Sequence, residues 1–237
     1  MNLILLFEDD FVESGLVEIK GRRLDHVKQV IRTKVGEDLT VGIENGKIGK
    51  GKVTRIDDDI LRMEVVLDIE PPPPIDITLV LALPRPSVLN RTLIAAASMG
   101  VKTFYLINAR RVEKSFWLSP KVSQENIREQ LILGLEQAKD TVMPKVIFKK
   151  GFKPFVEDEL PQLIEGNQAI LAHPVKGTVP LRGQTGTPVI LVVGPEGGLI
   201  DYEAEMLKSI GFKPVSAGER ILRVETIVPV LLSKLTS

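Results

Sequence analysis

PVILVVGPEGGLIDYEAEMLKSI, residues 188–210, joins an apolar run, a glycine-rich turn and an amphipathic segment. The run at 189–193 is typical of a buried strand, and the segment at 202–210 has apolar residues at helical spacing. A strand that leads through a short turn into a helix is the repeating unit of α/β folds. This stretch therefore predicts an α/β domain, with the turn at 194–198 following the carboxyl end of a strand.

The turn at 194–198 does not match a phosphate-binding loop. It has neither the G-x-x-x-x-G-K-[ST] pattern nor the dinucleotide pattern G-x-G-x-x-G. Glu196 lies in the turn, and Asp201, Glu203 and Glu205 follow it, so that a bound phosphate would meet repulsion. The turn suits a neutral or cationic ligand held by backbone groups, which glycines allow to approach closely. A plain strand-to-helix turn without a ligand is the alternative.

Strand-like and helix-like segments alternate through the chain after residue 74. The strand-like segments are 75–83, 102–107, 145–148, 168–173, 188–194 and 212–217, and the helix-like segments are 89–100, 125–140, 154–164, 202–210 and 225–235. The alternation predicts a largely parallel sheet with helices on its faces. Ligands bind beyond the carboxyl ends of such strands, so the loops after the last three strands are the expected site.

Four consecutive prolines, residues 71–74, mark a domain boundary, because they cannot continue a helix or the interior of a sheet. Before them the patterns are strand-like, and Asn45-Gly46 is a hairpin signal between two of the segments. One helix with several cations is expected at residues 24–32. We therefore expect a small, mostly β domain over residues 1–72 and the α/β domain over residues 73–237.

Composition excludes several classes of protein. The 237 residues contain no Cys and only two His, His26 and His173, so disulfides are excluded and no metal site is expected. The first ten residues lack the cationic start of a signal peptide, and no apolar stretch is long enough to span a membrane. We expect a cytoplasmic protein.

The net charge is zero, but cations are concentrated in two segments of the first domain. Residues 20–34 hold six cations and one anion, and residues 45–55 hold four cations and no anion. Two solvated faces balanced by nearby acids would explain this pattern, and so would an RNA-binding face. The residues expected to contact RNA phosphates are Arg22, Arg23, Lys28, Arg32, Lys34, Lys47 and Lys50.

Two further loops accompany the glycine turn: SAGERILRVET at 216–226 and LAHPVKG at 171–177. GPEGG, then Gly211-Phe212, then SAGERILRVET follow one another in this order along the chain. In this combination the chain resembles the SPOUT-superfamily methyltransferases that methylate N3 of a uridine in small-subunit ribosomal RNA. DHVKQVIRTKVGED, residues 25–38, is similar to a stretch in the PUA-like RNA-binding domain of that family. The resemblance thus covers both expected domains.

The resemblance implies a carboxy-terminal α/β domain tied in a trefoil knot, a small amino-terminal PUA-like β-barrel, and a homodimer acting on ribosomal RNA or the small ribosomal subunit. It also implies that three loops hold S-adenosylmethionine in a bent conformation. The family's cofactor-binding positions fall on Leu171, Ala172, His173, Val193, Gly194, Pro195, Gly197, Gly198, Ala217, Gly218, Ile221, Leu222 and Arg223.

The implied chemistry needs a methyl acceptor that is aligned with the donor, and no metal. Uridine N3 carries a proton, so either a base removes it or a cation stabilises the uracil anion. Arg223 is the first candidate for the cationic role and Arg220 the second, and Glu225 could orient an arginine through a bidentate pair. A structural salt bridge that ties the last helix to the loop is the alternative for both arginines.

The middle of the chain departs from the family pattern. Ser98-Met99 stand where Glu-Leu is usual, and Lys139-Asp140 where an arginine is usual. KSFWLSP, residues 114–120, is distinctive and unassigned, and its Trp117 is interpreted either as an RNA-stacking residue or as part of the core or a dimer contact. A methyltransferase of transfer RNA or of a ribose 2′-hydroxyl, and a non-catalytic RNA-binding relative, remain alternatives.

Overall fold

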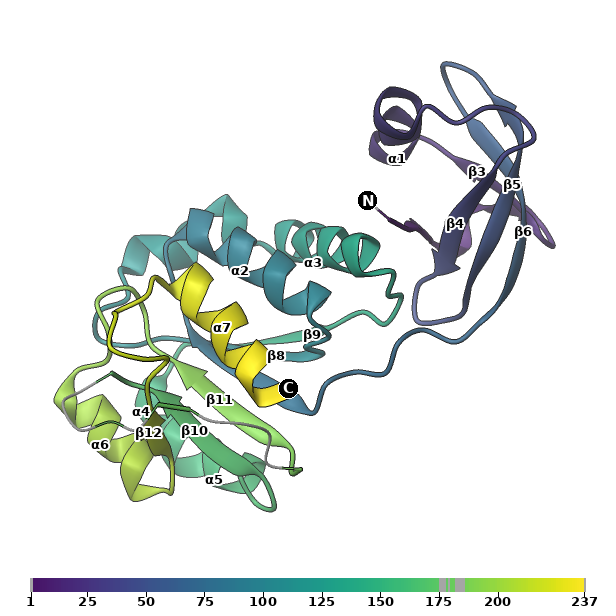
Figure 1. Ribbon diagram of the computed structural model, residues 1–237. Helices are drawn as coiled ribbons and strands as arrows, with labels where there is room; N and C mark the ends of the chain where they lie inside the picture. Colours follow the sequence, from purple (N-terminus) through teal and green to yellow (C-terminus); the bar gives the residue numbers. More distant parts are fainter. Residues whose placement is uncertain (1, 175–177, 179, 182–185, 237) are drawn as a thin grey trace. The chain divides into compact units, whose positions relative to one another are not determined.

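The computed structural model describes residues 2–174, 178, 180–181 and 186–236 (Figure 1). It divides into two compact units: Met1–Pro73 with Ile132–Met143, and Pro74–Leu131 with Pro144–Ser237. The division at residues 73 and 74 lies one residue from the boundary expected at the prolines. Residues 132–143, which were expected in the second domain, belong to the first unit.

The first unit is built on a six-stranded sheet with the order β1-β4-β5-β6-β3-β2. Its elements are β1 (Ile4–Leu6), a 3-10 turn (Glu8–Asp10), β2 (Phe11–Glu13), β3 (Leu16–Ile19), α1 (Arg22–His26) with a π-helical turn (Val27–Ile31), β4 (Asp38–Ile43), β5 (Ile48–Ile56) and β6 (Leu61–Ile69). All neighbours pair antiparallel except β1 and β4, which are parallel. Asn45, between β4 and β5, has a φ of 56°, as the predicted hairpin turn requires.

Strand β1 is buried on both faces, so its side chains enter two apolar clusters alternately. Ile4 and Leu6 join the cluster that α1 covers with Leu24 and Val27. Leu3 and Leu5, on the opposite face, pack with residues that include Ile132 and Leu135 from α3 (Gln124–Ala138).

Glu136 fixes the inserted segment 132–143 in the first unit. Its carbonyl oxygen accepts hydrogen bonds from the backbone N–H groups of Asn2 and Leu3, at 2.9 and 3.0 Å. Its buried carboxylate accepts one from Arg22 at 3.0 Å. The first unit is therefore completed by a segment that lies far from it in the sequence.

Arg23 has a structural role that differs from the expected RNA contact. Its guanidinium donates to both carboxylate oxygens of Asp10, at 2.6 and 2.7 Å, and to the carbonyl oxygen of Leu5 at 2.7 Å. It also lies over the ring of Phe7, 4.8 Å from the centroid, and its side chain is only 13% exposed. With its charge paired and its donors used, Arg23 is poorly placed to bind a phosphate.

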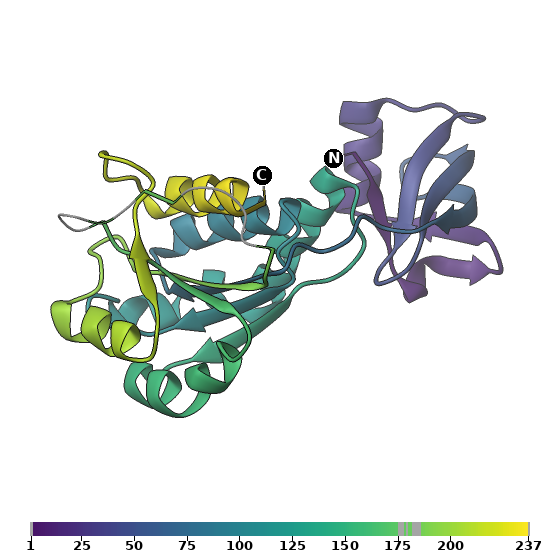
Figure 2. The same ribbon diagram turned by 60° about the horizontal axis from the view of Figure 1, so that its bottom comes forward.

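The second unit holds a six-stranded sheet with the order β12-β10-β11-β7-β8-β9, and every pair in it is parallel. The strands are β7 (Ile77–Ala82), β8 (Thr103–Ile107), β9 (Lys145–Lys149), β10 (Gln168–Ala172), β11 (Val189–Val193) and β12 (Lys213–Val215). The expected α/β alternation and parallel sheet are thus confirmed. Helix α7 (Val224–Thr236) and α2 (Pro86–Ser98) lie side by side on one face of the sheet (Figures 1 and 2).

The other face of this sheet is covered by α4 (Phe152–Pro154), α5 (Leu160–Leu163) and α6 (Asp201–Ser209) (Figure 2). The single helix expected over 154–164 is instead α4, a π-helical turn (Phe155–Glu159) and α5. Two 3-10 turns, Lys114–Leu118 and Pro120–Val122, follow β8. Within the described residues, no helix is long and apolar enough to cross a membrane.

Replacing Gly49 in β5 by alanine is predicted to disrupt the first unit. A Cβ atom at this position would lie 1.8 Å from the carbonyl oxygen of Val66 and 2.9 Å from the Cα of Leu67. Backbone atoms of a paired strand cannot move aside, so we expect a loss of more than about 3 kcal/mol in the free energy of unfolding, measured with denaturant. The control is Lys50→Ala on the exposed neighbour, expected to change stability by less than about 0.5 kcal/mol. Equal effects of the two substitutions would contradict the prediction.

Candidate functional site

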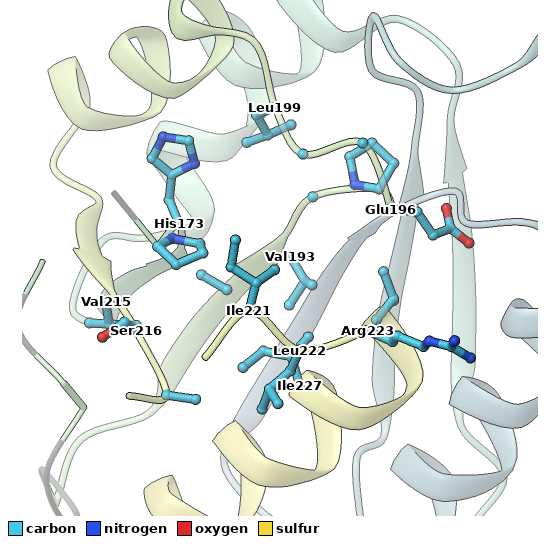
Figure 3. Close-up of a pocket in the computed structure, with 18 of the residues that line it drawn as sticks. His173, Val193, Glu196, Leu199, Val215, Ser216, Ile221, Leu222, Arg223 and Ile227 are labelled. Carbon is cyan, nitrogen blue, oxygen red and sulfur yellow. The ribbon is translucent and has the colours of Figure 1, made fainter. Parts of the chain in front are cut away.

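A pocket of about 490 Å³ lies beyond the carboxyl ends of β10, β11 and β12 (Figure 3). The three loops that follow these strands line it together, at the edge of the sheet that the sequence indicated. Of the residues predicted to bind the cofactor, the pocket is lined by Ala172, His173, Val193, Gly194, Pro195, Gly197, Gly198, Ala217, Ile221, Leu222 and Arg223.

Two predicted positions, Leu171 and Gly218, do not line the pocket. Leu171 is fully buried in β10, between β11 and β12, where it supports the loop from within the sheet. Gly218 lies in the loop that contributes its neighbour Ala217 to the lining. Residues 175–177 of the loop after β10 lie outside the described residues.

The glycine turn is closed by a backbone hydrogen bond from Gly198 to Pro195, at 2.7 Å. Gly198 has a φ of 71°, a conformation that glycine adopts without strain. The side chain of Arg111 lies against the turn and donates from Nη1 to the carbonyl oxygen of Gly197. A Cβ atom on Gly197 would come within 3.2 Å of Cδ of Arg111, so the glycine allows this close contact.

Arg111 lines the pocket although the sequence reasoning did not select it. It lies in the loop after β8, and only the loops after the last three strands had been singled out. The signal was available, since Arg110-Arg111 follow a predicted strand at the same edge of the sheet.

The charges around the pocket differ from those expected. Three arginines (Arg111, Arg220 and Arg223) and one acid (Glu196) line it, an excess of two positive charges. The acids of α6 do not line it, and the buried Glu203 carboxylate accepts hydrogen bonds from the backbone of Ile200 and Arg110, at 3.0 and 2.6 Å. The lining itself is thus less acidic than the sequence suggested, while Asp201 and Glu205 of α6 still act electrostatically on His173.

Polar groups stand on both sides of the pocket. His173 lies on one side with Val215 and Ser216, and Arg223 and Glu196 lie on the other (Figure 3). Burial lowers the pKa of His173 and the nearby charge of Lys208 lowers it further, while Asp201 and Glu205 act in the opposite direction, so the net shift favours the neutral imidazole. Oε1 of Glu196 accepts a hydrogen bond from the backbone of Arg85 at 2.9 Å.

The predicted catalytic residues separate into two groups. Arg220 and Arg223 line the pocket, and within the described part of the chain neither side chain forms an ion pair. Glu225 does not line it, and its Oε1 binds Nη2 of Arg91 on α2 at 3.2 Å. Because α7 packs on α2, Glu225 pairs here with Arg91 and with neither of the two candidate arginines.

Most of the predicted RNA-binding cations in the first unit have acidic neighbours. Lys28 binds Asp58 at 2.5 Å, and that hydrogen bond raises the pKa of Lys28. Lys47 lies 3.3 Å from Glu70, and Lys50 lies 3.9 Å from Asp38. Arg32 donates to the carbonyl oxygen of Gln29, and the Lys34 side chain makes no hydrogen bond or ion pair within the described ranges. Exposed pairs of this kind are weak and leave the cations available to a phosphate.

Trp117, which had two interpretations, packs within the second unit. Its Nε1 donates to Oδ1 of Asn108 at 3.1 Å, and its ring meets that of Phe148 edge to face. Asn108 begins the loop that carries Arg111, so Trp117 supports that loop.

Comparison with known proteins identifies relatives of the whole chain. A family model described as an RNA methyltransferase domain matches residues 71–236. Ribosomal RNA small subunit methyltransferase E of Aquifex aeolicus is 30% identical over 235 residues, covering 96% of this chain and 97% of its own. The protein of the same name from Treponema pallidum is 26% identical over 231 residues, covering 95% and 87%.

Two solved structures share the fold. The structure of ribosomal RNA small subunit methyltransferase E from Neisseria gonorrhoeae, bound to S-adenosyl methionine, has a TM-score of 0.75 at 22% identity and covers 98% of this chain and 95% of that one. A Legionella pneumophila protein in complex with the same cofactor has a TM-score of 0.74 at 23% identity, with coverages of 98% and 96%.

Replacing Glu203 by alanine is predicted to lower the free energy of unfolding by about 3 kcal/mol, because two backbone N–H groups lose their acceptor. Glu203→Gln, which keeps one carbonyl oxygen, should have an intermediate effect. Denaturant titration measures both. The matched control is Glu205→Ala on the same helix, where an exposed pair with Lys208 at 2.9 Å is worth less than about 0.5 kcal/mol. A loss at Glu203 no larger than at Glu205 would show that the carboxylate does not hold the two segments together.

Proposed function

The chain belongs to the ribosomal RNA small subunit methyltransferase E family, and we propose that it methylates N3 of a uridine in small-subunit ribosomal RNA with S-adenosylmethionine as donor. The observation that carries the proposal is the pocket formed by three loops, in which the residues of the family motifs meet. The family match covers the sheet and all three loops. The resemblance to the N3-specific enzymes rests on GPEGG and SAGERILRVET.

The residues present fit S-adenosylmethionine. Val193, Leu222 and Ile227 give the pocket an apolar wall suited to a base, and the glycines expose backbone groups to polar atoms of the ligand. The neutral His173 adds no charge that would repel a sulfonium, and Glu196 supplies one negative charge. When bound, the cofactor supplies the activated methyl group.

Arg223 would act on the acceptor base. N3 of uridine becomes nucleophilic only after its proton leaves, and the uracil anion that results needs a nearby positive charge. A guanidinium can supply that charge, and Arg223 lines the pocket and forms no ion pair within the described residues. Arg220, on the same loop, is the second residue that can supply this charge.

We further propose the trefoil knot, the PUA-like β-barrel and the homodimer that the family resemblance implies. After β11 the chain passes through α6 and returns to pair β12 with β10, a crossing that supports a knot at this end of the sheet. Ile221, 84% exposed at the pocket, is an apolar side chain that a partner subunit would cover.

In the cytoplasm, the first unit would bind ribosomal RNA through cations that, within the described residues, form only weak ion pairs or none. This proposed role is kept for five cations: Lys28, Arg32, Lys34, Lys47 and Lys50. Arg22 would contact RNA while it also pairs with Glu136. Arg23 is left out because Asp10 neutralises it.

Replacing Arg223 by alanine is predicted to lower the rate of methyl transfer by a factor of 10² to 10³, roughly the effect of removing one stabilising group from an anionic transition state. Cofactor affinity, measured by calorimetry, should change little, because the loops bind through their backbone. Arg223→Lys keeps the charge without the planar fork and should retain part of the activity. Near-normal turnover in the alanine variant would remove Arg223 from the mechanism.

Deletion of the gene is predicted to remove one 3-methyluridine from small-subunit ribosomal RNA. Mass spectrometry of nucleosides and of oligonucleotides from the deletion strain measures the loss and its position. Complementation with the wild type should restore the methyl group, and complementation with the Arg223→Ala variant should not. A methyl group missing from a ribose 2′-hydroxyl or from transfer RNA would overturn the proposal in favour of a different knotted methyltransferase.

A further inference from the structure

We propose that Arg111 is the site at which a backbone phosphate of the RNA substrate binds at the mouth of the pocket. The inference rests on the proposed function and adds to it a substrate contact on the second unit. None of the family motifs noted above includes this residue.

Arg111 is carried on a well-anchored loop. Ala109 and Val112 on either side of it are buried, and Val112 donates a backbone hydrogen bond to Ala109 at 3.0 Å. The backbone of Arg110 is held by the Glu203 carboxylate, and Asn108 is held by Trp117 at 3.1 Å. The position from which the Arg111 side chain extends is therefore fixed before any ligand binds.

The guanidinium itself is also oriented. Nη1 donates to the carbonyl oxygen of Gly197, and the aliphatic stem lies against the same glycine. An arginine has five N–H donors, and this bond uses one of them. Within the described ranges the Arg111 side chain lines the pocket and has no acidic partner, so most of its donors have no partner in the described part of the protein.

The ligand that matches this arrangement is an oxyanion with several acceptor atoms. A planar guanidinium fork recognises a phosphate through two parallel hydrogen bonds. An arginine held in place in advance loses little conformational entropy when it binds. Arg220 and Arg223 line the same pocket, and a concave surface with an excess of positive charge attracts anions. The phosphodiester is the anion that every RNA substrate carries.

The carboxylate of the methyl donor is a second source of an oxyanion at this site. The two sources differ in what the loss of Arg111 affects. Loss of a contact to RNA raises the KM for RNA and lowers the salt dependence of RNA binding, whereas loss of a contact to the donor lowers cofactor affinity. We commit to the RNA phosphate, because Arg111 is exposed and can be reached by a large polyanion.

The test compares Arg111→Ala, Arg111→Lys and the control Arg110→Ala in the full-length protein. Arg110 is exposed and does not line the pocket, and the alanine keeps its backbone bond to Glu203. The measurements are cofactor affinity by calorimetry, RNA affinity over a range of salt concentrations, and kcat and KM with small-subunit RNA.

For Arg111→Ala we expect a KM for RNA raised about tenfold, a slope of log affinity against log salt reduced by about one, and cofactor affinity within about threefold of the wild type. Arg111→Lys should keep the salt slope, because the charge remains, with a smaller rise in KM. Arg110→Ala should match the wild type in all measurements.

An unchanged salt slope in Arg111→Ala would overturn the inference. A tenfold loss of cofactor affinity would overturn it as well, assigning Arg111 to the donor or to support of the glycine turn. If the wild type transferred no methyl group to ribosomal RNA, the proposed function would fail. The salt slopes of wild type and variant would then still decide whether Arg111 contacts a phosphate.

Discussion

The Glu203 carboxylate joins the parts of the second unit on which the pocket depends. It lies in the first turn of α6, where it accepts the backbone N–H of Ile200 just after the glycine turn. Its other oxygen accepts the backbone N–H of Arg110, in the loop after β8. A single buried charge thereby fixes the start of the helix, the glycine turn and the segment that carries Arg111. Hydrogen bonds to a buried carboxylate are strong, and leaving such N–H groups without an acceptor is costly, so the three segments are held together.

Much of the second unit could be predicted from the sequence because its signals are local. The apolar run 189–193, the glycines and the amphipathic segment after them give the β11–α6 unit, and the parallel topology then places three loops at one edge. The inserted segment 132–143 gave no such signal. It is continuous with a helical pattern, and its membership of the first unit depends on backbone contacts of Glu136 with residues more than a hundred positions away.

Charges were the least predictable feature of both units, because a sequence does not reveal which charges neutralise one another. Arg23 stands in a run of cations in the sequence, yet its side chain is largely covered and pairs with Asp10 and Phe7. The acids after the glycine turn predicted repulsion of a phosphate, but Glu203 binds backbone N–H groups and three arginines line the pocket. The sequence places Arg111 after a strand at the same edge of the sheet, but its contact with Gly197, 86 residues away, is evident only in three dimensions.

The pocket has to accept a cationic donor although its lining carries an excess of positive charge, and the arrangement of groups explains how. Burial and Lys208 lower the pKa of His173 against the opposing effect of Asp201 and Glu205, which favours the neutral imidazole on one side of the pocket. The positive charges of the lining belong to exposed arginines. Their electric fields are screened by solvent and by the polyanionic RNA that the proposed reaction requires. Once RNA is bound, its phosphates would offset the excess charge. Donor binding and RNA binding would then favour each other, because each ligand reduces the electrostatic cost that the other meets.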